Sequence, residues 1–244
     1  MNSPYLPSEL PRLRADLALG LRAAAHHGLS EGVCNHFSVA LPDASRRFLI
    51  NPRGLHWSEV GAADIVLVDP HGAVLEGRHP VEPTAMYIHA AVHAIGGQAV
   101  VMHTHMPYAT ALTLTIDRAL DPTLSQGAMR FMGRIAVDAA YNGLALDAAE
   151  GERIGRAMRG RDVGFLANHG VIVTGASVAH AYDDLYYLER ACLHQWLAQS
   201  SGRPLAPVDP VLAKRVAQQS QSEREQSDLH FAALRRMLPE PAPR

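Results

Sequence analysis

The chain has 244 residues, of which 48% are hydrophobic and 19% are charged, as is typical of one folded domain with a sizeable core. Lys and Arg number 22 against 24 Asp and Glu, so the formal net charge of -2 creates no basic field that would attract nucleic acid or an anionic membrane. We therefore expect a single domain over residues 1–244 that binds a small-molecule substrate and neither nucleic acid nor a membrane.

Two further features favour a cytoplasmic protein. The first residues, MNSPYLPSEL, lack the basic start and apolar stretch of a secretory signal, and the longest apolar runs fall short of the roughly 20 residues that span a bilayer. The only cysteines, Cys34 and Cys192, are too few for a disulfide framework. We expect both thiols to be reduced.

The first third of the chain is expected to contain a helix, four strands and a second helix. Leucines recur at helical spacing over residues 8–27, with Ser8 as a candidate N-cap. The second helix is expected from Glu82 to Ile95, with Pro83 in its first turn. Apolar segments separated by turn residues predict the strands, of which the last two form a hairpin: 37–41, 47–50, 65–68 and 73–75.

The rest of the chain alternates strands with helices. Strands are expected at 99–102, 135–137, 163–167 and 171–173, and helices at 108–115, 147–158 and 177–199. A tail from Ser201 is richer in Pro, Gln and Arg, and it contains one more expected helix over residues 227–237. The interleaved order, with hairpins early in the chain, predicts an α/β domain around a mixed or antiparallel sheet.

The sharpest feature is His103-Thr-His105, which follows an apolar run of buried-strand type. Residues i and i+2 of a strand point to the same face, so both imidazoles project together, about 6–7 Å apart at Cα, and can chelate one divalent ion. A third candidate ligand is His169, which stands at the end of another short apolar strand before Gly170. Three protein ligands that leave a coordination position open are typical of a catalytic metal site. The alternative is partly exposed histidines at strand ends and turns.

Other residues are candidates for proton transfer. On a helix, Glu82, His89 and His93 share one face, and a carboxylate beside a metal can act as general acid or base. Glu82 can equally be a simple helix-capping charge, and the two histidines can be core or interface residues. Tyr141, in a loop, is a second candidate for moving a proton.

Two residues are candidates for binding a substrate anion. Arg53 lies in the turn Asn51-Pro-Arg-Gly54, where a guanidinium and nearby backbone N–H groups can hold a carboxylate or phosphate. His36 lies at the start of an early strand. Either can also be a solvated turn residue.

An ordered set of motifs resembles the class II aldolase/adducin family over about residues 12–200. The motifs are Glu31-Gly-Val-Cys-Asn-His-Phe-Ser38, Asn51-Pro-Arg-Gly54, Ile88-His-Ala-Ala-Val-His93, His103-Thr-His105 and Asn168-His-Gly170. The resemblance implies a three-layer α/β/α sandwich around a mixed, largely antiparallel sheet, and a homo-oligomer, commonly a tetramer. It also implies one divalent ion per chain, held by His103, His105 and His169, with zinc expected first and manganese or cobalt as alternatives.

The chain departs from the sugar-phosphate aldolases of that family where they hold phosphate. Their small hydroxyl donors are replaced by Asn35-His36, Arg53-Gly54 and Pro80-Val81-Glu82. Their catalytic glutamate lies four residues before the helix histidine, where this chain has Ala85, three residues after Glu82. The resemblance therefore favours a carboxylate substrate, such as a 2-keto or hydroxy acid, over a ketose phosphate.

The leading hypothesis is a metal-dependent carbon–carbon lyase that works by retro-aldol cleavage, with Glu82 or Tyr141 moving the proton. A decarboxylase of the same family passes through the same enolate and is the nearest alternative, and epimerase or dehydratase chemistry is also known in the family. A non-catalytic adducin-like scaffold is the rival class. The absence of G-x-G-x-x-G and G-x-x-x-x-G-K-[ST] motifs argues against a nucleotide-binding enzyme.

Overall fold

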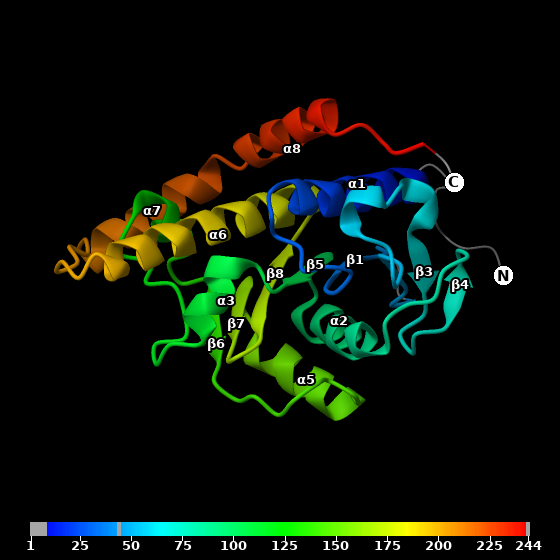
Figure 1. The fold of residues 1–244 in the computed structure, drawn as a ribbon, viewed down its shortest axis with the longest axis horizontal. Helices are drawn as coiled ribbons and strands as arrows, with labels where there is room; N and C mark the ends of the chain where they lie inside the picture. Colours follow the sequence, from blue (N-terminus) through cyan, green and yellow to red (C-terminus); the bar gives the residue numbers. More distant parts are fainter. Residues whose placement is uncertain (1–8, 43–44, 243–244) are drawn as a thin grey trace.

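The computed structural model describes residues 9–42 and 45–242, whose strands form one eight-stranded sheet (Figure 1). The strand order is β4-β3-β2-β1-β5-β8-β7-β6. Every neighbouring pair is antiparallel except β6 and β7, which confirms the expected mixed, largely antiparallel sheet. The strands are β1 His36–Ala40, β2 Phe48–Ile50, β3 Val66–Val68, β4 Val74–Glu76, β5 Val100–Thr104, β6 Ile135–Asp138, β7 Val163–Leu166 and β8 Gly170–Gly175.

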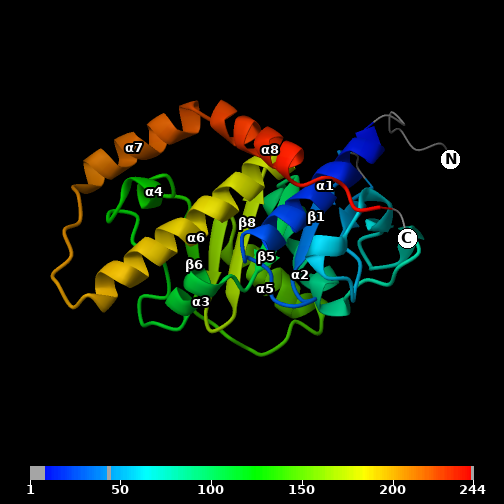
Figure 2. The ribbon, with the colours of Figure 1, turned by 45° about the horizontal axis from the view of Figure 1, so that its top comes forward.

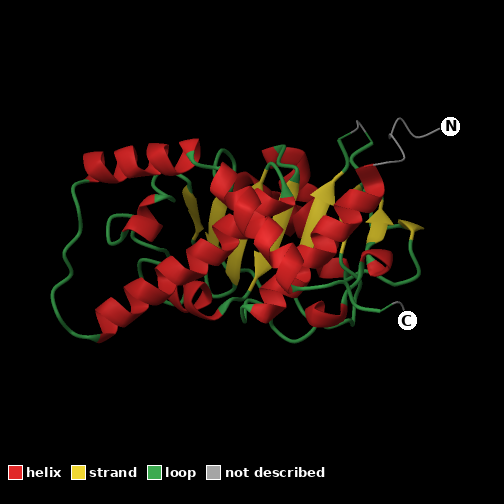
Figure 3. Cartoon of the chain, turned by 90° about the horizontal axis from the view of Figure 1, so that it is seen from above, coloured by secondary structure: helices red, strands yellow, loops and turns green. Residues whose placement is uncertain are grey.

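Helices cover both faces of the sheet and make the three layers of an α/β/α sandwich. Helices α1 and α6 lie on one face, with α8 packed over them, and α2 and α5 lie on the other (Figures 1 and 2). Seen from above, the long helices of the first face cross in front of the strands (Figure 3). The helices are α1 Glu9–His26, α2 Pro83–Gly96, α3 Pro107–Thr113, α4 Gln126–Met129, α5 Ala148–Ala157, α6 Val178–Ser200, α7 Pro210–Ser222 and α8 Glu225–Met237.

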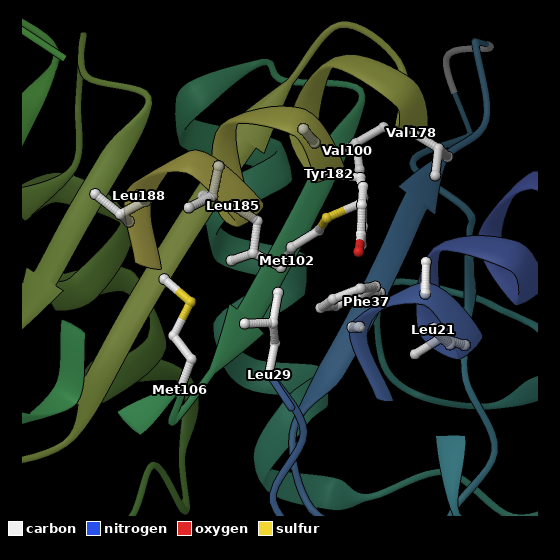
Figure 4. Packing of buried hydrophobic residues seen from close by; sticks show 14 of the residues in the cluster. Leu21, Leu29, Phe37, Val100, Met102, Met106, Val178, Tyr182, Leu185 and Leu188 are labelled. Carbon is white, nitrogen blue, oxygen red and sulfur yellow. The ribbon is translucent and has the colours of Figure 1, made fainter. Parts of the chain in front are cut away.

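The alternation of side chains along the central strands places apolar side chains in a core on each face of the sheet. On the first face, Phe37 and Met102 pack with Leu21 of α1 and with Tyr182 and Leu185 of α6 (Figure 4). Each fully buried apolar side chain of this size contributes roughly 1.5–3 kcal/mol to the free energy of unfolding. The neighbouring strand residues point the other way, so the central strands are apolar on both sides.

On the second face, Val101 of β5 and Ile172 of β8 pack against α2 and α5 through Ile88, Val92 and Ile154. Two glycines of α5, Gly151 and Gly155, allow this close contact between α5 and α2. A Cβ on Gly151 would lie 2.2 Å from the carbonyl oxygen of Tyr87, so the two helices touch backbone to backbone at that point.

Most expected elements are present, and several end at the expected residues. Ser177 caps the start of α6 by accepting from the N–H of His180. Helix α2 ends at Gly96, and its C-cap is Gly97, whose φ of 68° is left-handed. The proposed cap Ser8 lies outside the described residues. The sequence did not predict α4 or α7, nor the short 3₁₀ turns at Trp57–Glu59 and Ala62–Asp64.

The C-terminal helices are attached through buried ion pairs on α6. The carboxylate of Asp184, which is fully buried, accepts hydrogen bonds from Arg134 at 2.6 Å and from Arg224, just before α8, at 2.8 and 2.9 Å. Its neighbour Asp183 accepts from Ser227 and bonds the Nδ1 of His230 at 2.8 Å. Removing one partner of a buried ion pair leaves the other charge buried and unpaired, which is unfavourable. The ion pairs with Asp183 and Asp184 therefore fix the position of the tail.

Within residues 9–42 and 45–242, none of the helices combines the length and the apolar character that crossing a membrane requires.

Candidate metal centre

The pairing of two central strands brings the three expected ligands together. In β5, His103 lies opposite Ile172 of β8, and His169 directly precedes β8. One ring nitrogen each of His103, His105 and His169 lies within 4.8 Å of the others. The ring centroids are 4.8 to 5.1 Å apart and the rings meet edge to face. We call these three residues the histidine triad.

Hydrogen bonds on the outer side of the triad fix which ring nitrogen is free. The Nδ1 of His103 donates to the carbonyl oxygen of Val171 at 3.0 Å, and the Nδ1 of His105 bonds the carboxylate of Glu31. Both Nε2 atoms are therefore left as donors for a metal, in the pattern found around zinc in proteins. The Nε2 of His105 is buried and has no hydrogen-bond partner among the described residues. The donor set therefore fits a divalent ion.

Burial keeps two members of the triad, His103 and His169, in the neutral form that binds metal. Burial, and next the neighbouring His105, lower the pKa of His169 to about 4. Burial also holds the pKa of His103 well below its usual range, with smaller effects from His169 and His105. At neutral pH the two imidazoles are uncharged, so no proton has to be displaced before coordination.

Two features of the turn before β8 fix the position of His169. Asn168 adopts a left-handed φ of 55°, and its side chain accepts a hydrogen bond from Arg118 at 3.0 Å. Gly170 is needed for space: a Cβ there would lie 2.6 Å from the carbonyl oxygen of Thr104 and 2.7 Å from the His105 ring. The glycine thus lets the ring of His105 lie directly on β8.

Loss of the carboxylate behind His105 should weaken metal binding without abolishing it. We expect Glu31→Ala to raise the dissociation constant for zinc about 10- to 100-fold, because such outer partners orient the ligand and raise its basicity. Competition with a chromophoric chelator measures this constant. Glu152→Ala, which removes an exposed carboxylate paired with Arg156, is the control. Equal zinc affinity in both variants would exclude a role for Glu31.

Two predicted residues flank the triad. His36 is the cross-strand partner of His103 in β1, and burial, then His105, lower the pKa of His36 to about 4. Tyr141 is 54% exposed, and its ring centroid lies 6.4 Å from that of His169. Tyr141 therefore borders the small pocket beside His169, whereas His36 lies next to the triad in the sheet.

The other two predicted residues pair with each other. The Nε of Arg53 lies 2.8 Å from a carboxylate oxygen of Glu82. Glu82 is the N-cap residue of α2, with extended backbone angles, and its side chain caps no helical N–H. The expected common helix face therefore holds for His89 and His93, whereas Glu82 stands outside the helix.

Sequence reasoning missed residues that reach the triad across the sheet or from the next helix. Glu31 belongs to a motif that was noticed, but its contact with His105 depends on a turn before β1 that spacing alone does not reveal. Beside His169, a small pocket is lined by acidic and basic side chains as well as Tyr141. These are Asp138 and Glu150, which both accept hydrogen bonds from Arg153 at 2.7 to 2.9 Å.

Comparison with known proteins places this geometry in context. Residues 15–196 match the family model described as "Class II Aldolase and Adducin N-terminal domain". The crystal structure of an aldolase II superfamily protein from Pseudomonas syringae is 33% identical, covers 96% of this chain and 94% of its own, and superposes with a TM-score of 0.87. An L-fuculose 1-phosphate aldolase from Glaciozyma antarctica shares the fold, with a TM-score of 0.84 at 23% identity over 97% of this chain and 94% of its own. Decarboxylase NovR of Streptomyces niveus is 30% identical over 90% of this chain and 83% of its own length.

Proposed function

Because the chain belongs to the class II aldolase and adducin N-terminal domain family, we propose that it is a divalent-metal-dependent lyase. It would cleave a carbon–carbon bond of a small hydroxy- or keto-carboxylate by retro-aldol chemistry. The observation that supports this most is the histidine triad, with two outward nitrogens already held by hydrogen bonds. The ion would be zinc first, with manganese or cobalt as alternatives.

When bound, the ion would polarise the substrate carbonyl and stabilise the negative charge that develops as the bond breaks. His103, His105 and His169 would hold it and leave at least one position open to substrate. His36 and Tyr141, on either side of the triad, would contact the substrate or exchange its protons. Tyr141 and Glu82 remain the candidates for the group that first meets the proton.

The proposal of a carboxylate rather than a phosphate rests on Arg53 together with the loss of the small hydroxyl donors with which the sugar-phosphate aldolases hold phosphate. The Arg53 side chain is 59% exposed while paired with Glu82, so it is accessible to an incoming anion. A planar carboxylate matches the guanidinium fork, and a charged hydrogen bond of this kind is worth about 1.5–3 kcal/mol. The substrate carboxylate would replace Glu82 as the partner of Arg53, and the Glu82 carboxylate would then be released from this ion pair.

The proposed reaction can be tested without knowing the natural substrate. We expect the zinc-, manganese- or cobalt-loaded protein to exchange the methyl protons of pyruvate for deuterium. Retro-aldol cleavage of a 4-hydroxy-2-oxo acid forms the enolate of pyruvate, and the same enolate forms when pyruvate loses a methyl proton. Proton NMR in D₂O follows the exchange. The metal-free chain should be inactive. The proposal fails if no loaded form exchanges pyruvate or cleaves 4-hydroxy-2-oxo acids.

A substitution tests the anion site separately. Arg53→Ala should raise KM for a keto acid about 10-fold while kcat changes little, because a binding contact far from the reacting bond acts on both states equally. Steady-state kinetics on the same 4-hydroxy-2-oxo acid give both constants. Arg203→Ala, an exposed arginine of the tail, is the matched control. An unchanged KM would remove Arg53 from the anion site.

Decarboxylation is the second candidate function, and the likeness to Decarboxylase NovR favours it. Release of CO₂ from aromatic or keto carboxylates without an aldehyde product would identify it. An adducin-like scaffold receives less support, because a binding module does not require the triad. Assembly as a homotetramer in the cytoplasm belongs to the same proposal, and light scattering after gel filtration tests the assembly.

A further inference from the structure

Two asparagines near the histidine triad are almost completely buried. Asn35 is 3% exposed and directly precedes β1, and Asn51 is 1% exposed and directly follows β2. Because β1 lies between β2 and β5 and is antiparallel to both, these asparagines stand at the same end of the sheet as His105, which follows β5. Burying an amide is costly unless its oxygen and nitrogen find hydrogen-bond partners. The partners of the two side chains therefore indicate what they do.

Asn35 holds the backbone of a candidate metal ligand. Its Oδ1 accepts a hydrogen bond from the backbone N–H of His105 at 3.2 Å. The pairing of β5 with β8 ends at Thr104, so this N–H lies beyond the strand ladder. In the same turn as Asn35, the carboxylate of Glu31 bonds the Nδ1 of His105. The turn 31–35 thus holds His105 both by its ring and by its main chain.

The backbone conformation of Asn35 indicates a role for its side chain beyond the turn itself. Its φ of 70° is left-handed, a region that glycine enters without steric cost and that asparagine tolerates. If only the turn mattered, glycine would suit this position better. Asparagine adds the amide oxygen that reaches His105, which glycine cannot supply.

Asn51 ties the turn that carries Arg53 to Asn35. Its Nδ2 donates to the backbone carbonyl oxygen of Asn35 at 3.3 Å, and its Oδ1 accepts from the N–H of Phe37 at 2.9 Å. Both polar groups of this buried side chain are therefore bonded to the segment that begins β1. Pro52, whose ring fixes φ, is the single residue between Asn51 and Arg53.

The far side of the Arg53 turn is held as well. The N–H of Arg53 donates to the carbonyl oxygen of Pro80 at 2.9 Å, and its side chain pairs with Glu82. The backbone of Arg53 is thus fixed from two sides, while its exposed side chain can exchange one anionic partner for another. A connected set of bonds therefore runs from the Arg53 turn through the two buried amides to His105.

We propose that Asn35 and Asn51 are positioning residues whose amides set the place of Arg53 relative to the metal ligand His105, and thereby select the anionic substrates that reach both. We call the two side chains the amide bridge. This proposal rests on the anion site of the proposed lyase function. A substrate held at two points binds fully only when both are held in place, to within about 0.5 Å, by their surroundings. Neither asparagine touches the reacting atoms.

A double-mutant cycle between the amide bridge and Arg53 tests this proposal. Asn35→Gly keeps the left-handed turn but loses the bond to His105. At saturating zinc we expect it to raise KM for a 4-hydroxy-2-oxo acid about 10-fold with little change in kcat, and Asn51→Ala should do the same. In an Arg53→Ala background neither change should have much further effect, because there is then no arginine to misplace. The double variant is expected at about 10-fold, where independent effects would give about 100-fold.

A rescue variant and a control separate positioning from a general loss of structure. Asn35→Asp retains an oxygen that accepts from the N–H of His105, so its KM should stay close to that of the wild type. Gln195→Ala removes a buried amide of α6 that accepts from the N–H of Asp121 at 2.7 Å, outside the amide bridge. This matched control should leave KM unchanged, both alone and combined with Arg53→Ala.

Binding of malonate to the zinc-loaded variants, measured by calorimetry, follows the same cycle without turnover. Malonate can offer one carboxylate to the zinc and the other to Arg53, and it has no bond that retro-aldol chemistry cleaves. Coupled effects on KM and on the dissociation constant of malonate support the amide bridge.

Additive effects of Asn35→Gly and Arg53→Ala on both constants would overturn the amide bridge while the lyase function stands. Coupled effects on malonate binding, without cleavage of any 4-hydroxy-2-oxo acid, support the bridge and contradict the lyase function. If the zinc-loaded protein neither binds malonate nor cleaves these acids, both proposals are wrong.

Discussion

Replacing His103 by alanine is expected to remove the bound metal and to lower turnover about 10³-fold or more. His103 is 5% exposed, its orientation is fixed by Val171, and its ring touches both other members of the triad. Two histidines cannot hold a divalent ion in a three-ligand site, and loss of the ion removes the stabilisation of the developing enolate charge. Elemental analysis of protein purified without chelator or nickel affinity gives the metal content per chain.

The control for this substitution is a histidine outside every described cluster. His194 lies exposed on α6, and His194→Ala should keep the full metal content and activity. Near one zinc, manganese or cobalt per wild-type chain, lost in His103→Ala alone, supports the ligand assignment. Full retention in His103→Ala would refute it, and no metal uptake by the wild type on adding divalent ions would favour the scaffold alternative.

The metal-free chain is expected to lose most of its stability between pH 6.5 and pH 4. Burial lowers the pKa of His36 and of His93 to about 4 from the usual 6.5 of a histidine. The unfolded chain therefore binds protons in this range that the folded chain does not. The stabilisation is complete above pH 6.5 and falls with pH until the folded pKa is reached. At about 1.4 kcal/mol per pKa unit, each imidazole accounts for roughly 3 kcal/mol.

Urea unfolding at a series of pH values measures this loss. The carboxylates provide an internal comparison, because the pKa of Asp183 is lowered to about 2, despite its burial, by His230, Arg130 and Ser227. Its contribution is present above pH 3.8 and disappears only below it, so it leaves the histidine range undisturbed. His93→Gln should flatten the curve between pH 6.5 and pH 4. A free energy of unfolding that is constant over this range would contradict the neutral, buried state of these imidazoles.

Periodicity and short motifs predicted the fold because each is a local property. The alternation that buries Val101 and Met102 on opposite faces is visible in the sequence, and the same period of two places His103 and His105 on one face. The missed helices carry little of this signal. In α7 only Ala213 and Ala217 are buried, and α4 has four residues, fewer than two helical turns.

The polar contacts of the site could not be predicted in the same way. Ser38 meets His89 and His93 only because β1 pairs with β5 and α2 lies across them, and nothing in the local sequence sets that crossing. The role expected of Glu82 was inferred from helical spacing. The helix begins one residue later, and the ion pair with Arg53 links two segments about 30 residues apart.

The register between β5 and β8 has an evolutionary consequence. It is fixed by five consecutive pairs, from Val100 with Gly175 to Thr104 with Val171, and it brings His103 and His105 next to the turn that carries His169. The loop that carries Tyr141 lies outside this pairing, so it can diversify while the ligand positions persist. In such an arrangement, substrate specificity can change without any change in the metal ligands.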